Sequence, residues 1–210
     1  MQFFSYLISG ISLGSVYALI ALGYTMVYGI AKMLNFAHGD IIMIGSYIVF
    51  FAFGSAGLNP ILAIVLSMVV CTVLGVTIER IAYRPLRDAP SLAVLITAIG
   101  MSYLLQQVAQ LSWTSSPKSF TSVVKGFAPI SLFDGQLRIP AETVVTIAAC
   151  VVIMIALMLF IKYAPAGHAM LAVSEDRGAA QLMGVNVNAT ISLTFAIGSA
   201  LAAVAGALLC

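Results

Sequence analysis

The side chains best suited to chemistry lie in two short polar segments of an otherwise apolar sequence. The first segment, NFAHGD, contains Asn35, His38, Gly39 and Asp40 between two long apolar runs. Histidine and aspartate are common metal ligands, but no second cluster of such residues accompanies them, so the sequence predicts no metal site. Two interpretations remain open. One is a tight cytoplasmic turn in which Asn35 or Asp40 caps the next helix. The other is a broken helix whose free backbone groups face a pathway through the membrane.

The second polar segment, residues 168–188, is charged and helix-forming. A serine can accept a hydrogen bond from a backbone N–H in the first turn, and carboxylates are favourable near a helix N-terminus. Glycine suits the left-handed position that ends a helix. We therefore predict a short helix over 174–183, with its N-cap at the serine. The residues assigned to this element are Ser174, Glu175, Asp176, Ala180, Leu182, Met183 and Gly184.

Two interpretations of this predicted helix also remain open. It is either an interfacial connector between two membrane spans or a surface offered to a soluble partner. Ala179, Leu182 and Met183 are spaced by three and four residues, so their side chains share one side of the helix. Only 8% of the chain is charged, so a compact polar element on one face favours the partner surface.

The composition indicates which elements must position these segments. A chain that is 62% hydrophobic and 8% charged differs from a soluble domain, in which about a quarter of the residues are charged. A bilayer core needs roughly 20 apolar residues per helix, and the strands of a membrane barrel would alternate apolar and polar residues. We predict an all-α polytopic membrane protein with about six spans in one domain, 1–210. The expected spans are Phe3–Ala31, Ile41–Gly57, Pro60–Ile78, Ser91–Leu111, Glu142–Ile161 and Ala189–Cys210.

The basic residues of the short connections predict the orientation, because Lys and Arg are enriched in cytoplasmic loops. Arg80, Arg84 and Arg87 follow the third run, and the connection 163–188 contains Arg177. If these connections are cytoplasmic, the N-terminus lies outside and so does the segment 113–141. In that outer segment, Asp134-Gly135 between partly alternating apolar residues predicts a hairpin. The hairpin is either a dock for an external protein or a lid on the bundle.

Packing and polar positions within the spans give further expectations. Gly198, Ala202 and Gly206 recur at a spacing that lets helix backbones approach closely. The glutamines at 106, 107 and 110 are expected to form a wet interfacial end of the fourth span, in preference to a binding site. Asn188 is expected to cap the last helix.

The class of protein follows from the chemistry that the spans lack. The predicted spans hold no nucleophile–base pair, so a membrane-embedded enzyme is disfavoured. They also lack Lys, Arg, Asp and Glu away from their ends, whereas ion-coupled secondary transporters commonly carry such residues. There is no Walker-type GxxxxGK[ST] motif, so any ATP hydrolysis must come from a partner. We expect a noncatalytic transport subunit without a cofactor and without a nucleic-acid partner. The alternative is a secondary transporter or channel for a small neutral solute.

Several stretches of this sequence resemble branched-chain amino acid ABC transporter permeases of the LivH type, and they occur in the order expected for that family. The NFAHG segment and the ER-x-x-YRP-x-R connection are the most specific of them. The matching stretches are GSVYALIALGYTMVYGIAKMLNFAHGDIIMIGSY (14–47), IERIAYRPLR (78–87), ITAIGMSYLLQ (96–106), AVSEDRGAAQLMGV (172–185) and AIGSALAAVAG (196–206).

The resemblance implies an importer of leucine, isoleucine, valine or related compounds in the bacterial inner membrane. Two permease subunits would form the path, two cytoplasmic ATPase subunits would drive it, and a periplasmic amino-acid-binding protein would deliver the substrate. By that likeness, Glu175 to Gly184 corresponds to the loop that couples to the ATPase. Members of this family usually continue through further spans, whereas this sequence stops at Cys210 in an apolar run. A bundle incomplete at its C-terminus, from a truncated form, is therefore expected.

Overall fold

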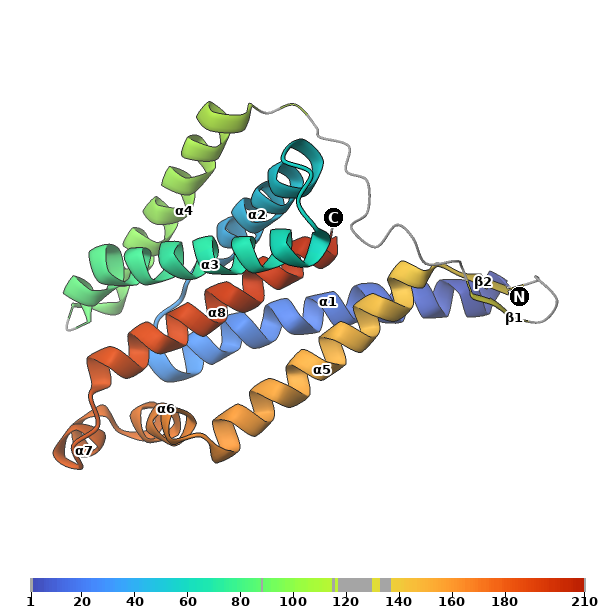
Figure 1. The fold of residues 1–210 in the computed structure, drawn as a ribbon. Helices are drawn as coiled ribbons and strands as arrows, with labels where there is room; N and C mark the ends of the chain where they lie inside the picture. Colours follow the sequence, from blue (N-terminus) through green and yellow to red (C-terminus); the bar gives the residue numbers. More distant parts are fainter. Residues whose placement is uncertain (1, 88, 115, 117–129, 133–136, 210) are drawn as a thin grey trace.

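The computed structural model describes residues 2–87, 89–114, 116, 130–132 and 137–209. Over these residues the chain is built of long helices and one short two-stranded hairpin (Figure 1). Two helices continue without a break into tighter or wider turns: α2 into the π-helical turns Phe50–Ser55, and α3 into Glu79–Tyr83 and Arg84–Leu86. The α-helices are α1 Gln2–Ala31, α2 His38–Val49, α3 Pro60–Ile78, α4 Ser91–Trp113, α5 Ala141–Tyr163, α6 Pro165–Glu175, α7 Arg177–Leu182 and α8 Val187–Leu209.

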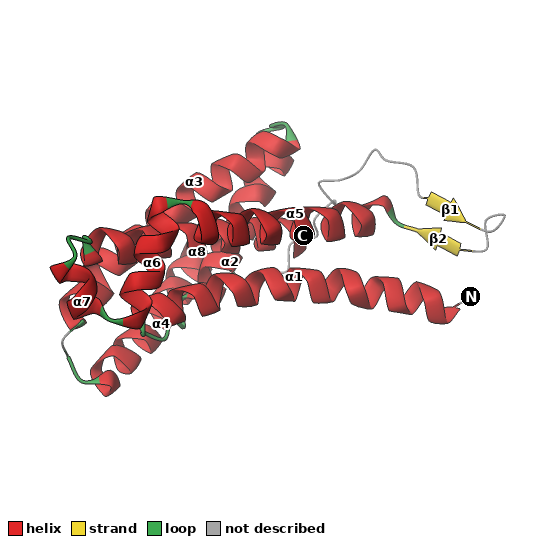
Figure 2. Cartoon of the chain, turned by 90° about the horizontal axis from the view of Figure 1, so that it is seen from below, coloured by secondary structure: helices red, strands yellow, loops and turns green. Residues whose placement is uncertain are grey.

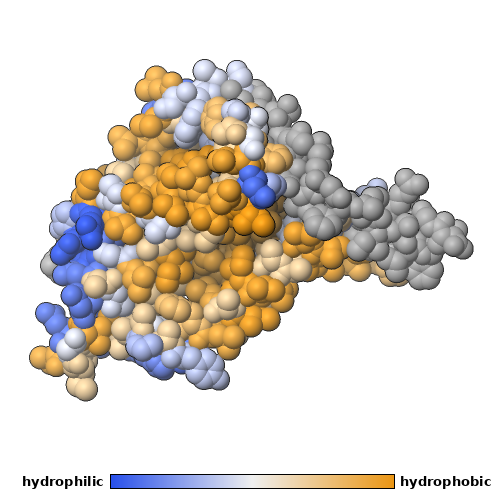
Figure 3. Space-filling model, in the orientation of Figure 1, coloured by the Kyte–Doolittle hydropathy of each residue, from blue (hydrophilic) through white to orange (hydrophobic). Residues whose placement is uncertain are grey.

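Six helices among the described residues are long and apolar enough to cross a membrane, which confirms the polytopic all-α prediction. Their apolar side chains cover much of the surface in Figure 3, and most of the hydrophilic residues gather where α7 and the α3–α4 connection lie. The second and third spans differ from the prediction, because the second begins at His38 and not at Ile41, and the third ends at Leu86 and not at Ile78. Three residues of NFAHGD, His38, Gly39 and Asp40, therefore belong to the first turn of α2 and not to the connection before it. The spans are Tyr6–Ala31, His38–Ser55, Pro60–Leu86, Ser91–Trp113, Thr143–Tyr163 and Val187–Leu209.

Helix α8 lies at the centre of the bundle and packs against α1, α2 and α3 (Figure 1). Its predicted small-residue face makes these contacts. A Cβ on Gly206 would lie 2.6 Å from the Ile42 carbonyl oxygen of α2, and a Cβ on Gly198 would lie 2.8 Å from Cγ2 of Val27 on α1. Ala202 between them is fully buried. The expected close approach of helix backbones is therefore present on this face.

The contact at Gly206 predicts a stability difference between two otherwise identical substitutions. Gly206→Ala would push a methyl group into the α2 backbone, so we expect a loss of about 1–3 kcal/mol in the free energy of unfolding. Gly29→Ala on α1 is the matched control, because nothing beyond the backbone of its own helix and its two chain neighbours lies within 4 Å of a Cβ built there. Unfolding of both variants in mixed micelles would measure the difference. Equal stability of the two would contradict the packing of α8 on α2.

The predicted outer hairpin is present as a pair of antiparallel strands, β1 Ile130–Leu132 and β2 Leu137–Ile139, with Leu132 opposite Leu137. The Asp134-Gly135 turn that we predicted lies outside the described residues. Figure 2 shows the strands beside the N-terminal end of α1, while α6 and α7 lie at the other end of the bundle. The two connections therefore lie at opposite ends, as the predicted topology requires.

Candidate functional site

The connection between α5 and α8 contains two helices and not the single helix predicted over 174–183. Pro165 occupies the first turn of α6, which runs through Ser174 to Glu175, and α7 begins at Arg177. The prediction that Ser174 is the N-cap was wrong, because its hydroxyl lies inside α6 and donates to the Leu171 carbonyl at 2.7 Å. Asp176 is the N-cap of α7.

The cap at Asp176 has a clear physical basis. Its backbone is extended (φ −148°, ψ 115°), which separates the two helices. Its Oδ1 accepts from the N–H groups of Gly178 at 2.7 Å and Ala179 at 3.1 Å. A carboxylate is a stronger acceptor than a hydroxyl and also complements the helix dipole. Asp176 therefore fixes where α7 starts and in which direction it leaves α6.

The other end of α7 follows the prediction. Gly184 has φ +85°, the left-handed conformation that glycine adopts most easily. Its N–H and that of Val185 donate to carbonyl groups of α7 at 3.0 Å each. Of the apolar residues on this helix and its cap, Ala180 is buried, whereas Leu182 is 90% exposed and Met183 is 84% exposed. Two large apolar side chains thus project from a rigid, capped turn, as on a surface that binds a partner.

Four of the six residues of the NFAHGD segment are buried in the bundle, whereas Phe36 and Gly39 are exposed. Helix α1 ends at Ala31, and α2 begins at His38 without a side-chain cap, so the expectation that Asn35 or Asp40 caps α2 was wrong. Both side chains have other partners in the interior: Asn35 Oδ1 accepts from the Tyr83 hydroxyl at 3.1 Å. Asp40 accepts from Gln106 Nε2 at 3.0 Å and from the Ser102 hydroxyl on α4.

The side chain of His38 shows how far the segment folds back. Its ring lies 6.0 Å from that of Tyr24, and a Cβ on Gly23 would lie 3.1 Å from its Cε1 atom. Gly23 is about two turns before the end of α1. His38 is 3% exposed, and its Nε2 has no hydrogen-bond partner among the described residues. Residues 32–37 therefore return along α1 into the bundle, and Gly39 is exposed at the first turn of α2.

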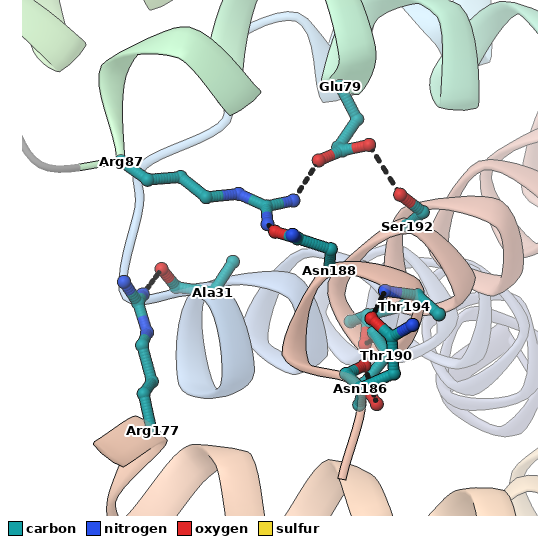
Figure 4. A network of polar contacts seen from close by, with 10 residues as sticks. Ala31, Glu79, Arg87, Arg177, Asn186, Asn188, Thr190, Ser192 and Thr194 are labelled. Carbon is teal, nitrogen blue, oxygen red and sulfur yellow. Dashed lines mark hydrogen bonds and ion pairs between the residues drawn. The ribbon is translucent and has the colours of Figure 1, made fainter. Parts of the chain in front are cut away.

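Sequence reasoning missed a buried charge cluster at the same end of the bundle as α7. Glu79 is fully buried, forms an ion pair with Arg87, and accepts from the Ser192 hydroxyl of α8 at 2.6 Å. Arg87 also donates to the side chain of Asn188 (Figure 4). The expectation that Lys, Arg, Asp and Glu stay at the ends of the spans was therefore wrong for Glu79, which lies within the span Pro60–Leu86, whereas Asp40 lies in the first turn of the span His38–Ser55. The signal for Glu79 was the absence of a turn residue before Pro85, which lets the helix continue past Ile78.

Two smaller expectations were also wrong. Helix α8 begins at Val187, and Asn186 caps it by accepting from the Ala189 N–H at 3.0 Å, which leaves Asn188 free to bind Arg87. Gln106 is not at a wet interface, because Asp40 binds it within the bundle. The neighbouring glutamines, at 107 and 110, are exposed as expected.

Comparison with known proteins connects this architecture to one family. Residues 6–210 match the family described as branched-chain amino acid transport system / permease component. The chain belongs to this family. It is 43% identical to the high-affinity branched-chain amino acid transport system permease protein BraD of Pseudomonas aeruginosa, over 97% of this chain and 69% of that protein. It is 40% identical to the permease LivH of Escherichia coli, over 100% of this chain and 71% of that protein.

A more distant permease also matches this chain. The probable branched-chain amino acid transport permease LivH of Methanocaldococcus jannaschii is 30% identical over 91% of this chain and 61% of that protein. No solved structure matches the chain. The relatives are transport permease subunits and not enzymes, so the chain is a noncatalytic membrane transport component.

Proposed function

We propose that this chain is the permease subunit of an ABC importer for branched-chain amino acids, and that α7 couples it to separate ATPase subunits. The observation that carries the coupling assignment is the geometry of α7, a capped helix with Leu182 and Met183 almost fully exposed. The names of the related permeases support the substrate class. An apolar tip on a rigid turn fits a groove on a soluble partner better than it fits a simple connector.

The remaining partners follow from the same proposal. A second permease subunit completes the path, and a periplasmic amino-acid-binding protein delivers the substrate on the side of the β1–β2 hairpin. The exposed apolar side chains along α4 and α5 face the lipid bilayer or that second subunit. Asn35 lies in the break between α1 and α2, residues 32–37, and His38 and Asp40 lie in the first turn of α2 with Gly39 between them. We place these three buried polar side chains beside the translocation path. Their burial inside the bundle supports this placement.

The proposal includes an orientation in the inner membrane, with the N-terminus outside and α7 in the cytoplasm. In a variant without native cysteines, a cysteine at Ala89 should react with a membrane-impermeant thiol reagent only from the cytoplasmic side. A cysteine at Ser116 should react only from the outside. Labelling of intact and permeabilised cells measures both. Reversed labelling would exclude the coupling assignment of α7, because an ATPase acts from the cytoplasm.

Substrate class is tested by uptake in cells that lack their own branched-chain amino acid permeases and express this chain with its partner subunits. We expect uptake of radiolabelled leucine, with competition from unlabelled isoleucine and valine and none from lysine. Cells without the chain are the control. Leucine uptake equal to that control, with the chain present in the membrane, would exclude the proposed substrate class.

A further inference from the structure

Helix α7 is joined to the membrane bundle by few contacts. Ala180 is its only buried side chain among the residues Arg177 to Leu182. Two cavities of about 440 and 540 Å³ lie next to it, and both are lined by Arg87 and Arg177. The helix is therefore not packed on the core over a broad apolar area. A movement of α7 can therefore reach the bundle only through individual side-chain contacts or through the backbone that joins α7 to α6 and α8.

One side chain of α7, that of Arg177, extends from α7 to the end of α1. Arg177 donates a hydrogen bond to the carbonyl oxygen of Ala31, the last residue of α1 (Figure 4). Carbonyls in the last turn of a helix lack an intrahelical partner, and a cation near them complements the helix dipole. The contact therefore connects the start of α7 with the end of α1, which are far apart in the sequence.

The atom that Arg177 binds lies at the start of the break. Lys32 follows Ala31 with φ +50°, a conformation that residues with a Cβ adopt at a cost. The chain then returns into the bundle to place Asn35 and His38 in the interior. Holding the Ala31 carbonyl fixes the peptide that leads into this left-handed residue. A movement of α7 would thus change the conformation at Lys32 and the position of the segment behind it.

We propose that Arg177 is the positioning residue through which α7 moves the break between α1 and α2. Displacement of α7 by the ATPase pulls on the end of α1, and the segment 32–37 transmits that movement to the buried polar side chains. This inference rests on the proposed function, because it requires an ATPase on α7. Beyond that function, it assigns the transmission of movement to the hydrogen bond between Arg177 and Ala31, and it identifies 32–37 as the segment that moves.

Because Arg87 has partners of its own, the hydrogen bond between Arg177 and Ala31 can be removed while the bundle stays folded. Arg87 binds Glu79 and Asn188, so it joins the end of α3 to the start of α8 without involving α7. That network stays complete when Arg177 is changed. Asp176 likewise keeps the cap of α7. We therefore expect a change at Arg177 to uncouple α7 from α1 and to leave both the bundle and the docking helix in place.

The test compares Arg177→Ala and Arg177→Lys, with Arg84→Ala as a matched control because Arg84 is an exposed arginine at the same end of the bundle. The assembled transporter is reconstituted, and leucine uptake per ATP hydrolysed is measured beside ATPase co-purification. Arg177→Ala should retain its ATPases and lower the uptake per ATP about tenfold, the order expected for loss of a hydrogen bond from a charged group. Arg177→Lys should restore part of the loss, because lysine can donate to the same carbonyl, and Arg84→Ala should match the parent.

A second measurement reports the conformation of the break, the segment 32–37. Phe36 lies in it and is 45% exposed, so a cysteine at this position reports its conformation through the rate of thiol labelling. The rate should change on ATP addition in the parent and stay constant in Arg177→Ala. Normal uptake per ATP in Arg177→Ala would overturn the inference and leave the proposed function intact, as would loss of ATPase binding by that variant alone. Failure of the parent transporter to bind ATPases would instead overturn the proposed function.

Discussion

Replacing Leu182 with aspartate should abolish ATPase association while the membrane bundle remains folded. The side chain is 90% exposed at the end of α7, so it contributes little to packing within the chain. An unpaired charge in an apolar groove is costly, and substitution at the centre of an interface commonly costs at least 2 kcal/mol. We expect ATPase affinity to fall at least about 30-fold and ATP-driven uptake to be lost. Co-purification of the ATPases and uptake by the reconstituted transporter measure the two effects.

The matched control at this position is Leu182→Met, which keeps an apolar side chain of similar size and should bind the ATPases almost normally. Thermal unfolding in detergent should be the same for the parent and both variants. Normal transport by Leu182→Asp with its ATPases bound would show that α7 is only a connector between α6 and α8. The coupling assignment would then have to move to another cytoplasmic segment.

Replacing Glu79 with alanine should cause the largest loss of stability among single changes at the polar end of the bundle. The carboxylate is fully buried and binds both Arg87 and Ser192. The side chain of Arg87 is only 10% exposed, so Glu79→Ala leaves a nearly buried cation without its counter-ion. Breaking a buried ion pair from one side costs about 3–5 kcal/mol. Unfolding in mixed micelles should show a loss of this size.

The double variant Glu79→Ala with Arg87→Ala separates the ion pair from general packing. Its loss of stability should be smaller than the sum of the two single losses, because the residues share one network. Glu175→Ala is the control, since that carboxylate is exposed and such changes usually stay within about 0.5 kcal/mol. Additive losses at positions 79 and 87 would show that the two side chains act independently, against the contact in Figure 4.

Elements specified by local chemistry could be predicted from the sequence. The apolar runs give five of the six spans to within three residues at each end, because the bilayer sets both their length and their composition. The third span continues past its predicted end at Ile78 to Leu86. Gly184 marks the end of α7 because few other residues adopt its backbone conformation easily. The strands of the outer hairpin follow from residues that alternate around a turn. The face of Gly198 and Gly206 likewise follows from their spacing.

Features that depend on contacts between distant segments could not be predicted in this way. Glu79 and Asp40 stand at the ends of apolar runs, where the sequence suggests solvent, yet partners on α8 and α4 hold them in the interior. The sequence predicts a wet helix end for Gln106, since nothing near it in the chain indicates its partner, Asp40, which lies on another span.

The start of α7 was misplaced for a different reason. Ser174 and Asp176 are both good caps, and the choice depends on α6. Pro165 starts that helix, which then incorporates the serine and leaves the cap to Asp176.

The most direct test of the central claim is ATP-driven uptake in proteoliposomes that contain this chain, the second permease subunit and the ATPases. Leucine-loaded binding protein is added outside and ATP is enclosed inside. We predict that radiolabelled leucine accumulates only when ATP and the binding protein are both present, and that Leu182→Asp abolishes the accumulation. Leucine uptake without ATP that follows an imposed proton or sodium gradient would contradict the account. It would indicate a secondary transporter in which Asp40 or Glu79 carries the coupling ion.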